Sequence, residues 1–590
     1  MQKIKIGVIV MKWDLSVFYK SVDYSFIKSD LEHFLTKTKK LVENYENKIN
    51  ESIDAETAKK FFIEIENILD GFSRPMQFSS LLFSEDTSNT KYQQLYSISS
   101  QYYSKIKELL SPLNSEFAKL SDEKLKSLSN EIPEYSNFFN KILEEKKHIL
   151  SKDGEKILAA TSISRRDAIA ELYEKITSSY TFEIEIDGKV QHLTDSEIRS
   201  LRRSPDGELR KKAMKTLFEK YEKDNLVING LYNIVVKDYD TEARLRNYKK
   251  PISMRNMENR VSDESVEKLI EVTVNNVDIV HKYYEWKSEK MNETLTPADI
   301  YAPLNKSPKK YSFEEAKEIV LDAYFEFDEK AGKIVKEFFD EKRIHSEISK
   351  GKMGGAFCSY YTPKIKPFVL VNFTGQMSDV MTLAHELGHG LHGTLSSKQT
   401  FLNYETPLTM AEIASVFGEF LVFEKLKNQL TGEDKKFFIA SKLEEIFATM
   451  FRQNMFARFE IKSHNLISKQ GMATWDELSD IYEKELKLMF GNSVKITPEY
   501  RFEWSTIPHF YHTPFYVYAY NYANCLVIAL YEKYLEEGKT FVPKYLELLE
   551  SGGKDKPERL LKKVGININE EKFWQKAFDF LEKMLKEVVQ

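Results

Sequence analysis

The sequence predicts a mainly α-helical protein built from two or more lobes. Apolar residues recur at spacings of three, four and seven along most of the chain, which is the pattern of amphipathic helices. Glycine is scarce in the first 180 residues, so long helices can run there without interruption. A chain of 590 residues also exceeds the size at which a single hydrophobic core stops growing.

The first 180 residues are predicted to form a helical scaffold. Ser29 and Glu32 are spaced as in a capping box, which places the start of the first long helix near residue 29. Pro75, Pro112 and Pro133 are expected to separate helices, because proline lacks the backbone N–H group that a helix interior requires. The predicted helical segments are 31–49, 55–70, 90–112, 114–150 and 155–178.

Residues 181–193 interrupt the helical pattern. Alternating residues flank Asp187 and Gly188, a dipeptide suited to a two-residue type I′ turn. We therefore expect a β-hairpin at the edge of the first lobe. Helices are expected to resume at about residue 194 and to continue to about residue 290.

Charge and composition exclude several classes of function. The chain has 86 Lys and Arg against 91 Asp and Glu, a net charge of −5 without a basic stripe, so nucleic acid is not an expected partner. No segment approaches eighteen uninterrupted apolar residues, so no membrane span is expected. Two cysteines, Cys358 and Cys525, cannot form a disulfide framework, which favours a reducing, cytoplasmic setting.

Residues 1–10 place basic residues before a short apolar run. The run is shorter than the apolar region of a signal peptide, and no small-residue cleavage site comes after it. We therefore expect no export signal. We interpret these ten residues as an extension upstream of a natural start at Met11.

The composition changes at Gly351, where a glycine-rich run precedes the apolar segments 356–358 and 367–373. We expect a small antiparallel sheet beside the next helix. An edge strand there could pair with a substrate peptide through its unpaired backbone groups. Alternatively, the strands could only support the helix, and the sequence leaves both interpretations open.

That helix carries an HExxH motif, made by His385, Glu386 and His389. Residues four apart lie on one helix face, so the two histidines can offer nitrogen atoms to one metal ion. Glu386 lies beside them and can act on a water molecule at the metal. The alternatives are core histidines with hydrogen-bond partners, or solvent-facing residues of an ordinary helix.

A third metal ligand is expected, because a catalytic zinc site usually has three protein ligands and one open position. Glu412 lies 27 residues beyond His385, in a second predicted helix that has Pro407 in its first turn. Glu419 lies two turns later. A carboxylate on an otherwise apolar helix surface is costly unless it is paired or bound to metal. We predict Glu412 as the third ligand, and Glu419 either as the partner that orients a ligand histidine or as an ordinary salt-bridge partner.

Together with Glu412, the extended motif from His385 to His392 resembles the oligoendopeptidase F branch of the thimet oligopeptidase family of zinc metallopeptidases. The resemblance extends from about residue 12 to the end of the chain. Further blocks occur in the order found in that family, at 12–16, 208–213, 299–304, 351–357, 367–372, 508–511, 514–518 and 551–554.

The resemblance implies roles for the metal-site residues. His385, His389 and Glu412 would hold one zinc ion, and Glu386 would be the general base toward the attacking water. His392 is expected to be structural, because three ligands are already supplied.

The resemblance also implies residues on the substrate side. His509 and tyrosines of the segment 511–520 match the region that supplies hydrogen bonds to the substrate carbonyl. Tyr518 is the first candidate for the oxyanion donor, and Tyr511 or Tyr516 is the second. Cys358 is interpreted as a small buried residue, since no group that would activate its thiol is evident. The residues expected to bind substrate are Gly354, Gly355, Ala356 and Phe357, together with Tyr511 and Tyr516.

The expected protein is therefore a zinc-dependent endopeptidase that hydrolyses internal bonds of short, unstructured peptides. The resemblance implies an elongated, two-lobed helical fold with a thermolysin-like HExxH helix and a deep channel that excludes folded proteins. Its domains would be a helical domain at 11–193 and a zinc peptidase domain at 194–590. The alternatives are a carboxypeptidase or dipeptidase of the same family, and a non-catalytic peptide-binding protein with a structural zinc. A monomer or a simple homo-oligomer is expected.

Overall fold

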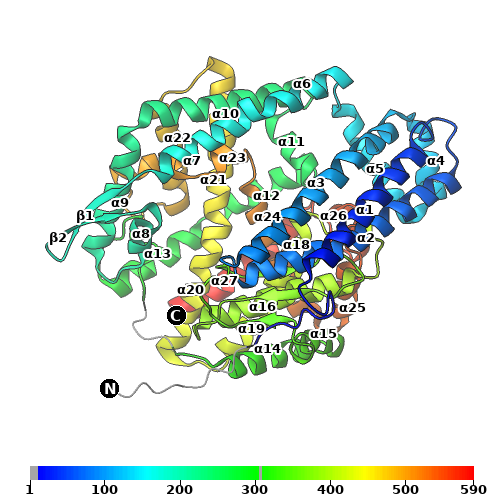
Figure 1. Cartoon of the computed structure of the whole chain (residues 1–590). Helices are drawn as coiled ribbons and strands as arrows, with labels where there is room; N and C mark the ends of the chain where they lie inside the picture. The colour runs from blue at the N-terminus through cyan, green and yellow to red at the C-terminus, as the bar shows by residue number, and fades with distance from the viewer. Residues whose placement is uncertain (1–10, 305–308) are drawn as a thin grey trace. The chain divides into compact units, whose positions relative to one another are not determined.

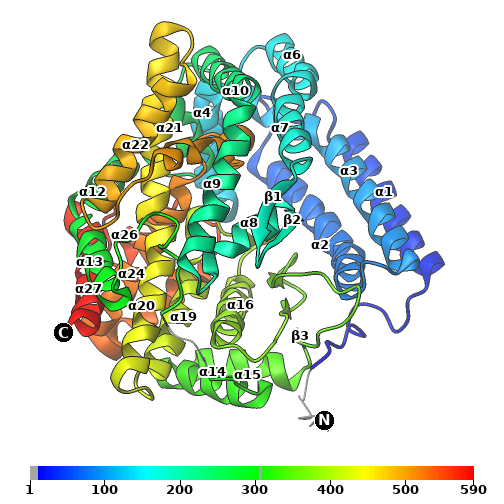
Figure 2. The same cartoon turned by 90° about the vertical axis from the view of Figure 1, so that its left-hand side faces the viewer.

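The computed structural model describes residues 11–304 and 309–590, and it confirms a mainly α-helical fold (Figures 1 and 2). Residues 1–10, interpreted above as an extension, lie outside the described residues. The chain divides into two compact units, each assembled from three segments of sequence. Among the described helices, none combines the length and the apolar content that a membrane span requires.

Unit 1 contains the HExxH helix, and its three segments end at Lys146, Gln429 and Ile566. Its described helices and strands are α1 (Tyr24–Tyr45), α2 (Ala55–Glu85), α3 (Thr90–Lys119), α4 (Asp122–Glu131), α5 (Ser136–Glu145), α14 (Phe313–Phe327), α15 (Glu329–Asp340), β3 (Ile344–His345), β4 (Phe357–Ser359), β5 (Phe368–Leu370), α16 (Met377–Ser396), α17 (Phe401–Tyr404), α18 (Leu408–Ala411), α19 (Ile413–Lys427), α25 (Val542–Glu550) and α26 (Pro557–Lys563).

Unit 2 contains the predicted hairpin, and its three segments begin at Lys147, Leu430 and Asn567. Its described helices and strands are α6 (Lys152–Ser162), α7 (Ala168–Ser178), β1 (Phe182–Ile186), β2 (Lys189–Leu193), α8 (Asp195–Ser200), α9 (Gly207–Lys223), α10 (Asn225–Leu245), α11 (Pro251–Glu258), α12 (Asp263–Asn275), α13 (Asp278–Met291), α20 (Gly432–Thr449), α21 (Phe451–Gln470), α22 (Trp475–Phe490), α23 (His509–His512), the greater part of α24 (Tyr518–Glu537), and α27 (Glu571–Val589).

The hairpin expected at 181–193 is confirmed as β1 and β2, which pair antiparallel with Ile186 opposite Lys189. Asp187 and Gly188 have φ angles of 52° and 73°. Positive φ at both central residues is what a type I′ turn requires. The hairpin lies within unit 2, and the domain boundary proposed at residue 193 stays a prediction.

The first helix begins earlier than the capping box at Ser29 indicated. Oδ1 of Asp23 accepts hydrogen bonds from the backbone N–H groups of Ser25 and Phe26, at 2.9 and 3.2 Å. These are two of the first-turn donors that a helix leaves unsatisfied, so Asp23 is the N-cap of α1.

Two prolines do not end their helices, contrary to expectation. α2 runs through Pro75, and α3 runs through Pro112. Proline inside a helix costs about 3 kcal/mol, and burial of the apolar face of α2 on both sides of Pro75, by Phe72 and Met76, offsets that cost. Pro133 comes after the end of α4, as predicted.

A three-stranded sheet in unit 1 has the strand order β3–β5–β4. β4 and β5 pair antiparallel, as expected, with Cys358 opposite Val369. β3 pairs with the other edge of β5 in parallel, with Ile344 opposite Val369, so the sheet is mixed. A two-residue strand is too short for a recognisable sequence pattern. The helix α16 packs against β4 and β5, which places the sheet beside the HExxH helix.

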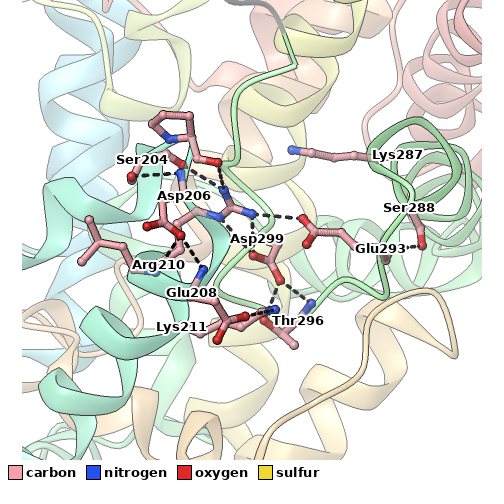
Figure 3. A network of polar contacts seen from close by, with 12 residues as sticks. Ser204, Asp206, Glu208, Arg210, Lys211, Lys287, Ser288, Glu293, Thr296 and Asp299 are labelled. Carbon is pink, nitrogen blue, oxygen red and sulfur yellow. Dashed lines mark hydrogen bonds and ion pairs between the residues drawn. The ribbon is translucent and has the colours of Figure 1, made fainter. Parts of the chain in front are cut away.

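Unit 2 contains a buried ionic network that joins two of the sequence blocks named above (Figure 3). Arg210, on α9, has a side chain that is 1% exposed, and its Nη2 lies 2.9 Å from Oδ1 of Asp299. The same guanidinium donates to Oε1 of Glu293 at 3.1 Å and to the carbonyl oxygen of Ser204 at 2.9 Å. Asp299 also accepts hydrogen bonds from the backbone N–H and the hydroxyl of Thr296, both at 2.8 Å. The network therefore fixes the loop after α13 against the start of α9.

Removal of the Asp299 carboxylate should destabilise the protein, because Arg210 then loses its fully buried partner. We expect Asp299→Ala to lower the free energy of unfolding by about 3 to 5 kcal/mol, measured by urea denaturation followed by circular dichroism. Glu208→Ala is the matched control on the same helix, since the Glu208 side chain is 88% exposed and its ion pair with Lys211 is a surface pair. Such pairs contribute less than about 1 kcal/mol. Equal losses of stability in the two variants would contradict this interpretation.

Candidate metal centre

Three predicted metal ligands lie together in unit 1. His385 and His389 are one turn apart on α16, and Glu412 lies at the junction of α18 and α19. Oε2 of Glu412 is 3.4 Å from Nε2 of His385 and 3.5 Å from Nε2 of His389. The two Nε2 atoms are 3.2 Å apart. Two elements separated in sequence therefore bring two imidazoles and one carboxylate to a common point.

The spacing of these atoms fits a metal ion with the size and geometry of zinc. Zinc binds imidazole nitrogen and carboxylate oxygen at about 2.0–2.2 Å in a tetrahedral arrangement, which separates neighbouring donor atoms by roughly 3.3–3.5 Å. The observed separations are 3.2, 3.4 and 3.5 Å. Two imidazoles and one carboxylate are also the donor set of catalytic zinc sites, which keep a fourth position open.

Glu419 orients the first histidine of the motif. Its Oε1 lies 2.6 Å from Nδ1 of His385, so the Nε2 atom of the same ring faces the other two donors. Burial of His385 disfavours its charged form. The hydrogen bond and the charge of Glu419, together with the charges of Glu412 and Glu386, outweigh burial and raise the pKa of His385 to about 9. The structure thus places Glu419 where a carboxylate fixes the orientation of a ligand histidine.

Glu386 lies beside the three donors on α16, and only 6% of its surface is exposed. Burial raises the pKa of its carboxyl to about 7, and the charge of Glu412 adds to that effect, while the charge of His385 opposes it. A carboxyl group with a pKa near 7 can both accept and release a proton close to neutral pH. The environment of Glu386 therefore suits a general base.

His392 and Cys358 lie close by but are not among the three donors. His392 is 2% exposed, its Nε2 lies 3.3 Å from the hydroxyl of Thr406, and burial lowers its pKa to about 3. A buried neutral imidazole with a hydroxyl partner fits the structural role expected for His392. Burial also raises the pKa of the Cys358 thiol, which disfavours the reactive thiolate.

Close contact between α16 and α19 brings Glu412 to the histidines. A Cβ atom at Gly388 would lie 2.6 Å from Cα of Ser415 on α19, and one at Gly418 would lie 3.1 Å from the carbonyl oxygen of Ala384 on α16. The first distance is shorter than carbon atoms can approach, so a side chain at position 388 would push the helices apart, and the second is a tight contact for a Cβ atom.

The glycine-rich segment leads into the edge strand β4. The side-chain amide of Asn372 donates to the carbonyl oxygens of Met353 and Gly355, at 3.0 and 2.8 Å, and this fixes the loop. Gly355 has a φ of +78°, a conformation that favours glycine. At Gly354 and Gly355, no heavy atom of the described residues beyond the immediate chain neighbours lies within 4 Å of where a Cβ would be. A peptide backbone could therefore approach this segment closely.

A cavity of about 1130 Å³ lies beside β4, within unit 1. Tyr360 and Ala411 line the end of the cavity that is near the metal centre. Ala411 directly precedes Glu412 in the chain. Burial raises the pKa of the Tyr360 hydroxyl, and Tyr360 is close enough to Glu412 and Glu386 for their charges to raise it further. Its walls come mainly from apolar side chains of α2, α3, α5 and α17, among them Phe61, Phe72, Met76, Leu110, Phe138 and Leu402.

The predicted oxyanion residues lie in unit 2. The ring of Tyr516 stacks over the imidazole of His509, with centroids 5.8 Å apart and planes inclined by 9°. The hydroxyl of Tyr520 is 3.3 Å from Nε2 of the same imidazole. Tyr518, the first candidate, is directed elsewhere: it is fully buried, and its hydroxyl accepts a hydrogen bond from Asn259 at 2.9 Å. This geometry therefore does not favour Tyr518 as the oxyanion donor.

Tyr511 is also buried, and its ring stacks on Tyr173 with centroids 3.8 Å apart. Tyr516 and Tyr520 therefore remain as the tyrosines that accompany His509. Sequence reasoning did not single out Tyr520, although its spacing of four residues from Tyr516 is the spacing that brings side chains together on a helix.

A mainly helical fold, with an HExxH helix and a carboxylate close to its two histidines, is that of a metallopeptidase. Comparison with known proteins identifies the particular family. The family model described as peptidase family M3 matches residues 200–580, and the model described as oligopeptidase F matches residues 116–182. The first match covers more than half of the chain, so the chain belongs to peptidase family M3.

The sequence similarity to known proteins extends over nearly the whole chain. The chain is 29% identical to an oligoendopeptidase F homolog of Borreliella burgdorferi, over 98% of this chain and 97% of that protein. It is also 29% identical to the chromosomal oligoendopeptidase F of Lactococcus lactis subsp. cremoris, over 98% of this chain and 96% of that protein. Among solved structures, a putative peptidase from Chlamydophila abortus has the same fold, with a TM-score of 0.89 at 24% identity over 98% of both chains.

Enlargement of Gly388 should weaken the metal centre, because it pushes α19 and Glu412 away from α16. We expect Gly388→Ala to lower the melting temperature by several degrees, since overpacking costs about 1 to 3 kcal/mol. We also expect the zinc affinity, measured by competition with a chromophoric chelator, to fall at least about tenfold. Gly230→Ala in α10 is the control, because, outside the local backbone of α10, no heavy atom in the described part of the chain lies within 4 Å of its Cβ position. A Gly388→Ala variant that binds zinc as tightly as the control would contradict this account.

Proposed function

We propose that this chain is a zinc-dependent endopeptidase that hydrolyses internal bonds of short, unstructured oligopeptides. The observation that carries the proposal is the convergence of His385, His389 and Glu412, with the buried carboxyl of Glu386 beside them. Membership of peptidase family M3 supports the peptidase activity. The names of the relatives support cleavage within oligopeptides rather than at their ends.

The residues that would hold zinc are His385, His389 and Glu412. A zinc ion bound there would supply a Lewis acid for the scissile carbonyl and lower the pKa of water at the open position toward about 7. Glu419 contributes by holding His385 through Nδ1, so that Nε2 remains directed at the centre. The charge that Glu419 provides also increases the basicity of that ligand.

Glu386 would move the proton. In the attack, its carboxylate takes a proton from the water that adds to the scissile carbonyl, and the protonated carboxyl then gives a proton to the leaving amine. Burial of Glu386, which raises the pKa of its carboxyl, favours the protonated form that the second step requires. General acid and base catalysis of this kind contributes roughly 10²- to 10⁴-fold to the rate.

Negative charge develops on the former carbonyl oxygen during the attack, and it requires hydrogen-bond donors. The family resemblance assigns this role to a histidine and tyrosines of the segment 509–520. The pairing of His509 with Tyr516 and Tyr520 supports one of these two tyrosines in place of Tyr518.

The substrate would extend along β4 and into the adjoining cavity. β4 is an edge strand of the described sheet, and its backbone groups can form hydrogen bonds with the backbone of a substrate peptide. Such bonds do not depend on the substrate's side chains, which suits a peptidase that acts on many peptides. The cavity adds a preference, because its walls are largely aromatic and aliphatic. We therefore propose that one position of a good substrate carries a large apolar side chain.

Two further proposals concern the setting of the enzyme. Its partners would be short peptides, and it would act as a monomer or a simple homo-oligomer in the cytoplasm.

A carboxypeptidase or dipeptidase of the same family is the nearest alternative activity, and a non-catalytic peptide-binding protein with structural zinc is the alternative from another class. The intact Glu386 beside the donors argues against the latter.

Two variants separate catalysis from metal binding. Glu386→Gln should keep zinc but lower kcat on an internally quenched peptide by at least about 10²-fold, because the amide cannot accept the proton. Glu412→Ala should lose zinc, as measured by metal analysis after dialysis, because one of three ligands is removed.

Unchanged cleavage by Glu386→Gln would rule out the proposed mechanism. Zinc retained by Glu412→Ala would place the third ligand elsewhere. Cleavage only at a terminus, detected by mass spectrometry, would establish the carboxypeptidase or dipeptidase alternative.

The apolar cavity should impose a measurable preference. We expect replacement of successive residues of a fixed peptide by Phe and by Asp to reveal one position at which Phe gives a kcat/KM at least about tenfold higher, since burial of a Phe side chain is worth about 1.5–3 kcal/mol. Ser80→Phe, on the cavity wall, should remove that preference by filling the space. Ser104→Phe is the control, because Ser104 is exposed on α3 and does not line the cavity. An unchanged preference in Ser80→Phe would exclude this cavity as its source.

A further inference from the structure

A turn in unit 2 adopts a backbone conformation that its sequence does not favour. The backbone N–H of Tyr516 donates to the carbonyl oxygen of Thr513 at 3.1 Å, which closes a four-residue turn. Pro514 occupies the second position, where proline is favoured. Phe515 occupies the third position with a φ of +58°, where glycine or asparagine is favoured. Among the described non-glycine residues with positive φ, Phe515 is the only aromatic one.

The surroundings of Phe515 maintain this conformation. Its ring centroid lies 4.3 Å from that of His464 and 5.6 Å from that of Tyr239. Its backbone N–H donates to Oε1 of Glu460 at 2.7 Å, and Nε of Arg255 donates to the carbonyl oxygen before it at 3.2 Å. A left-handed conformation costs an ordinary residue about 1–2 kcal/mol, so the buried ring is the reason for phenylalanine at this position.

Glu460 is placed there at a cost to stability. It lies on α21, is 1% exposed, and uses only Oε1 as an acceptor, whereas Oε2 has no hydrogen-bond partner in the described part of the chain. Burial raises the pKa of Glu460 to about 8, although the hydrogen bond from Phe515 and the charge of Arg255 oppose the shift. A buried carboxyl group with one partner is less favourable than an apolar residue of similar size. Stability alone therefore does not account for Glu460.

The turn determines where the next side chain lies. Tyr516 is the residue whose ring stacks on His509, and His509 lies on the other side of the turn, at the start of α23. A change at Phe515 would alter the direction of the Tyr516 side chain, because Phe515 directly precedes Tyr516 in the turn. The other contact that the two rings share is Tyr520, whose hydroxyl lies 3.3 Å from Nε2 of His509 and whose ring lies 5.3 Å from that of Tyr516.

We propose that Glu460 and Phe515 form a latch that holds the 513–516 turn and thereby sets the stacking of Tyr516 on His509. Both are positioning residues, since the contacts of the Glu460 carboxylate and the Phe515 ring found in the described part of the chain are with groups other than the side chains of His509 and its tyrosines. The functional consequence rests on the function proposed above for His509 and its tyrosines. The structural consequence, the stacking itself, does not depend on that function.

The latch can be tested with variants that act on different parts of it. Glu460→Leu removes the acceptor and keeps the volume, whereas Glu460→Gln keeps the acceptor. Phe515→Gly removes the ring that packs against His464 and Tyr239, and it gives the backbone of the turn access to other conformations. The control is Ile467→Ala, since Ile467 is a buried residue about two turns beyond Glu460 on the same helix. Its truncation lowers stability by about 2 to 5 kcal/mol.

The first measurement is kinetic, on the full chain loaded with zinc. We expect Glu460→Leu and Phe515→Gly to lower kcat at least about tenfold with KM changed by less than about threefold, because misplacement of catalytic groups by about 1 Å can cost 10²-fold. We expect Glu460→Gln and Ile467→Ala to keep kcat within about twofold of the native value. A native kcat in folded, zinc-loaded Glu460→Leu would overturn the functional consequence.

The second measurement reads the stacking without activity. The protein is labelled with ¹³C at histidine and studied by NMR. The ring signal of His509 is the one that is absent from the spectrum of His509→Gln. The ring current of Tyr516 shifts this signal as long as the two rings are stacked. We expect Glu460→Leu and Phe515→Gly to move this signal and the two other variants to leave it in place. An unmoved His509 signal in folded Glu460→Leu overturns the latch. If Glu460→Leu does not fold, Phe515→Gly decides by the same signal. If the native protein cleaves no peptide, this signal still tests the latch, and only the proposed function fails.

Discussion

The close contact of α16 with α19 is the constraint on which the metal centre depends. The HExxH helix supplies two imidazoles, but a carboxylate must come from a different element. Glycines at 388 and 418 remove the bulk that would keep the helices apart. The same approach brings Glu412 to the Nε2 side of His385 and Glu419 to its Nδ1 side. One helix packing therefore provides both a donor atom and the orientation of another donor.

Buried ionisable side chains occur in two different settings in this protein. Arg210 and Asp299 are both buried and satisfy each other in unit 2, so their network contributes to the fold. Glu386 and Glu460 are buried acids for which no salt bridge is found among the described residues, and burial raises the pKa of each above its ordinary value. Both lie near candidate catalytic side chains. The acidic groups that are costly to bury are thus the ones to which we assign proton transfer and positioning.

Local patterns allowed much of the candidate site to be predicted. The spacing of His385 and His389 follows from the helical repeat alone, and the cost of an unpaired carboxylate on an apolar helix singled out Glu412 and Glu419. The hairpin was predictable because both turn residues tolerate positive φ. Which tyrosine accompanies His509 was not predictable, because tyrosine packs equally well in a core and beside a histidine.

By itself, the sequence determined the helical class, the HExxH motif and the family, and it indicated Glu412 as the candidate third donor, because each depends on short-range spacing or on ordered motifs. Only the tertiary structure decided the rest. Packing on both sides of Pro75 lets α2 continue through a proline. The parallel pairing of β3 with β5 and the left-handed Phe515 depend on contacts with residues distant in sequence. Burial of Tyr518 against Asn259 leaves Tyr516 and Tyr520 with His509. Such contacts outweigh local preferences of about 1–3 kcal/mol, and no local pattern reports them.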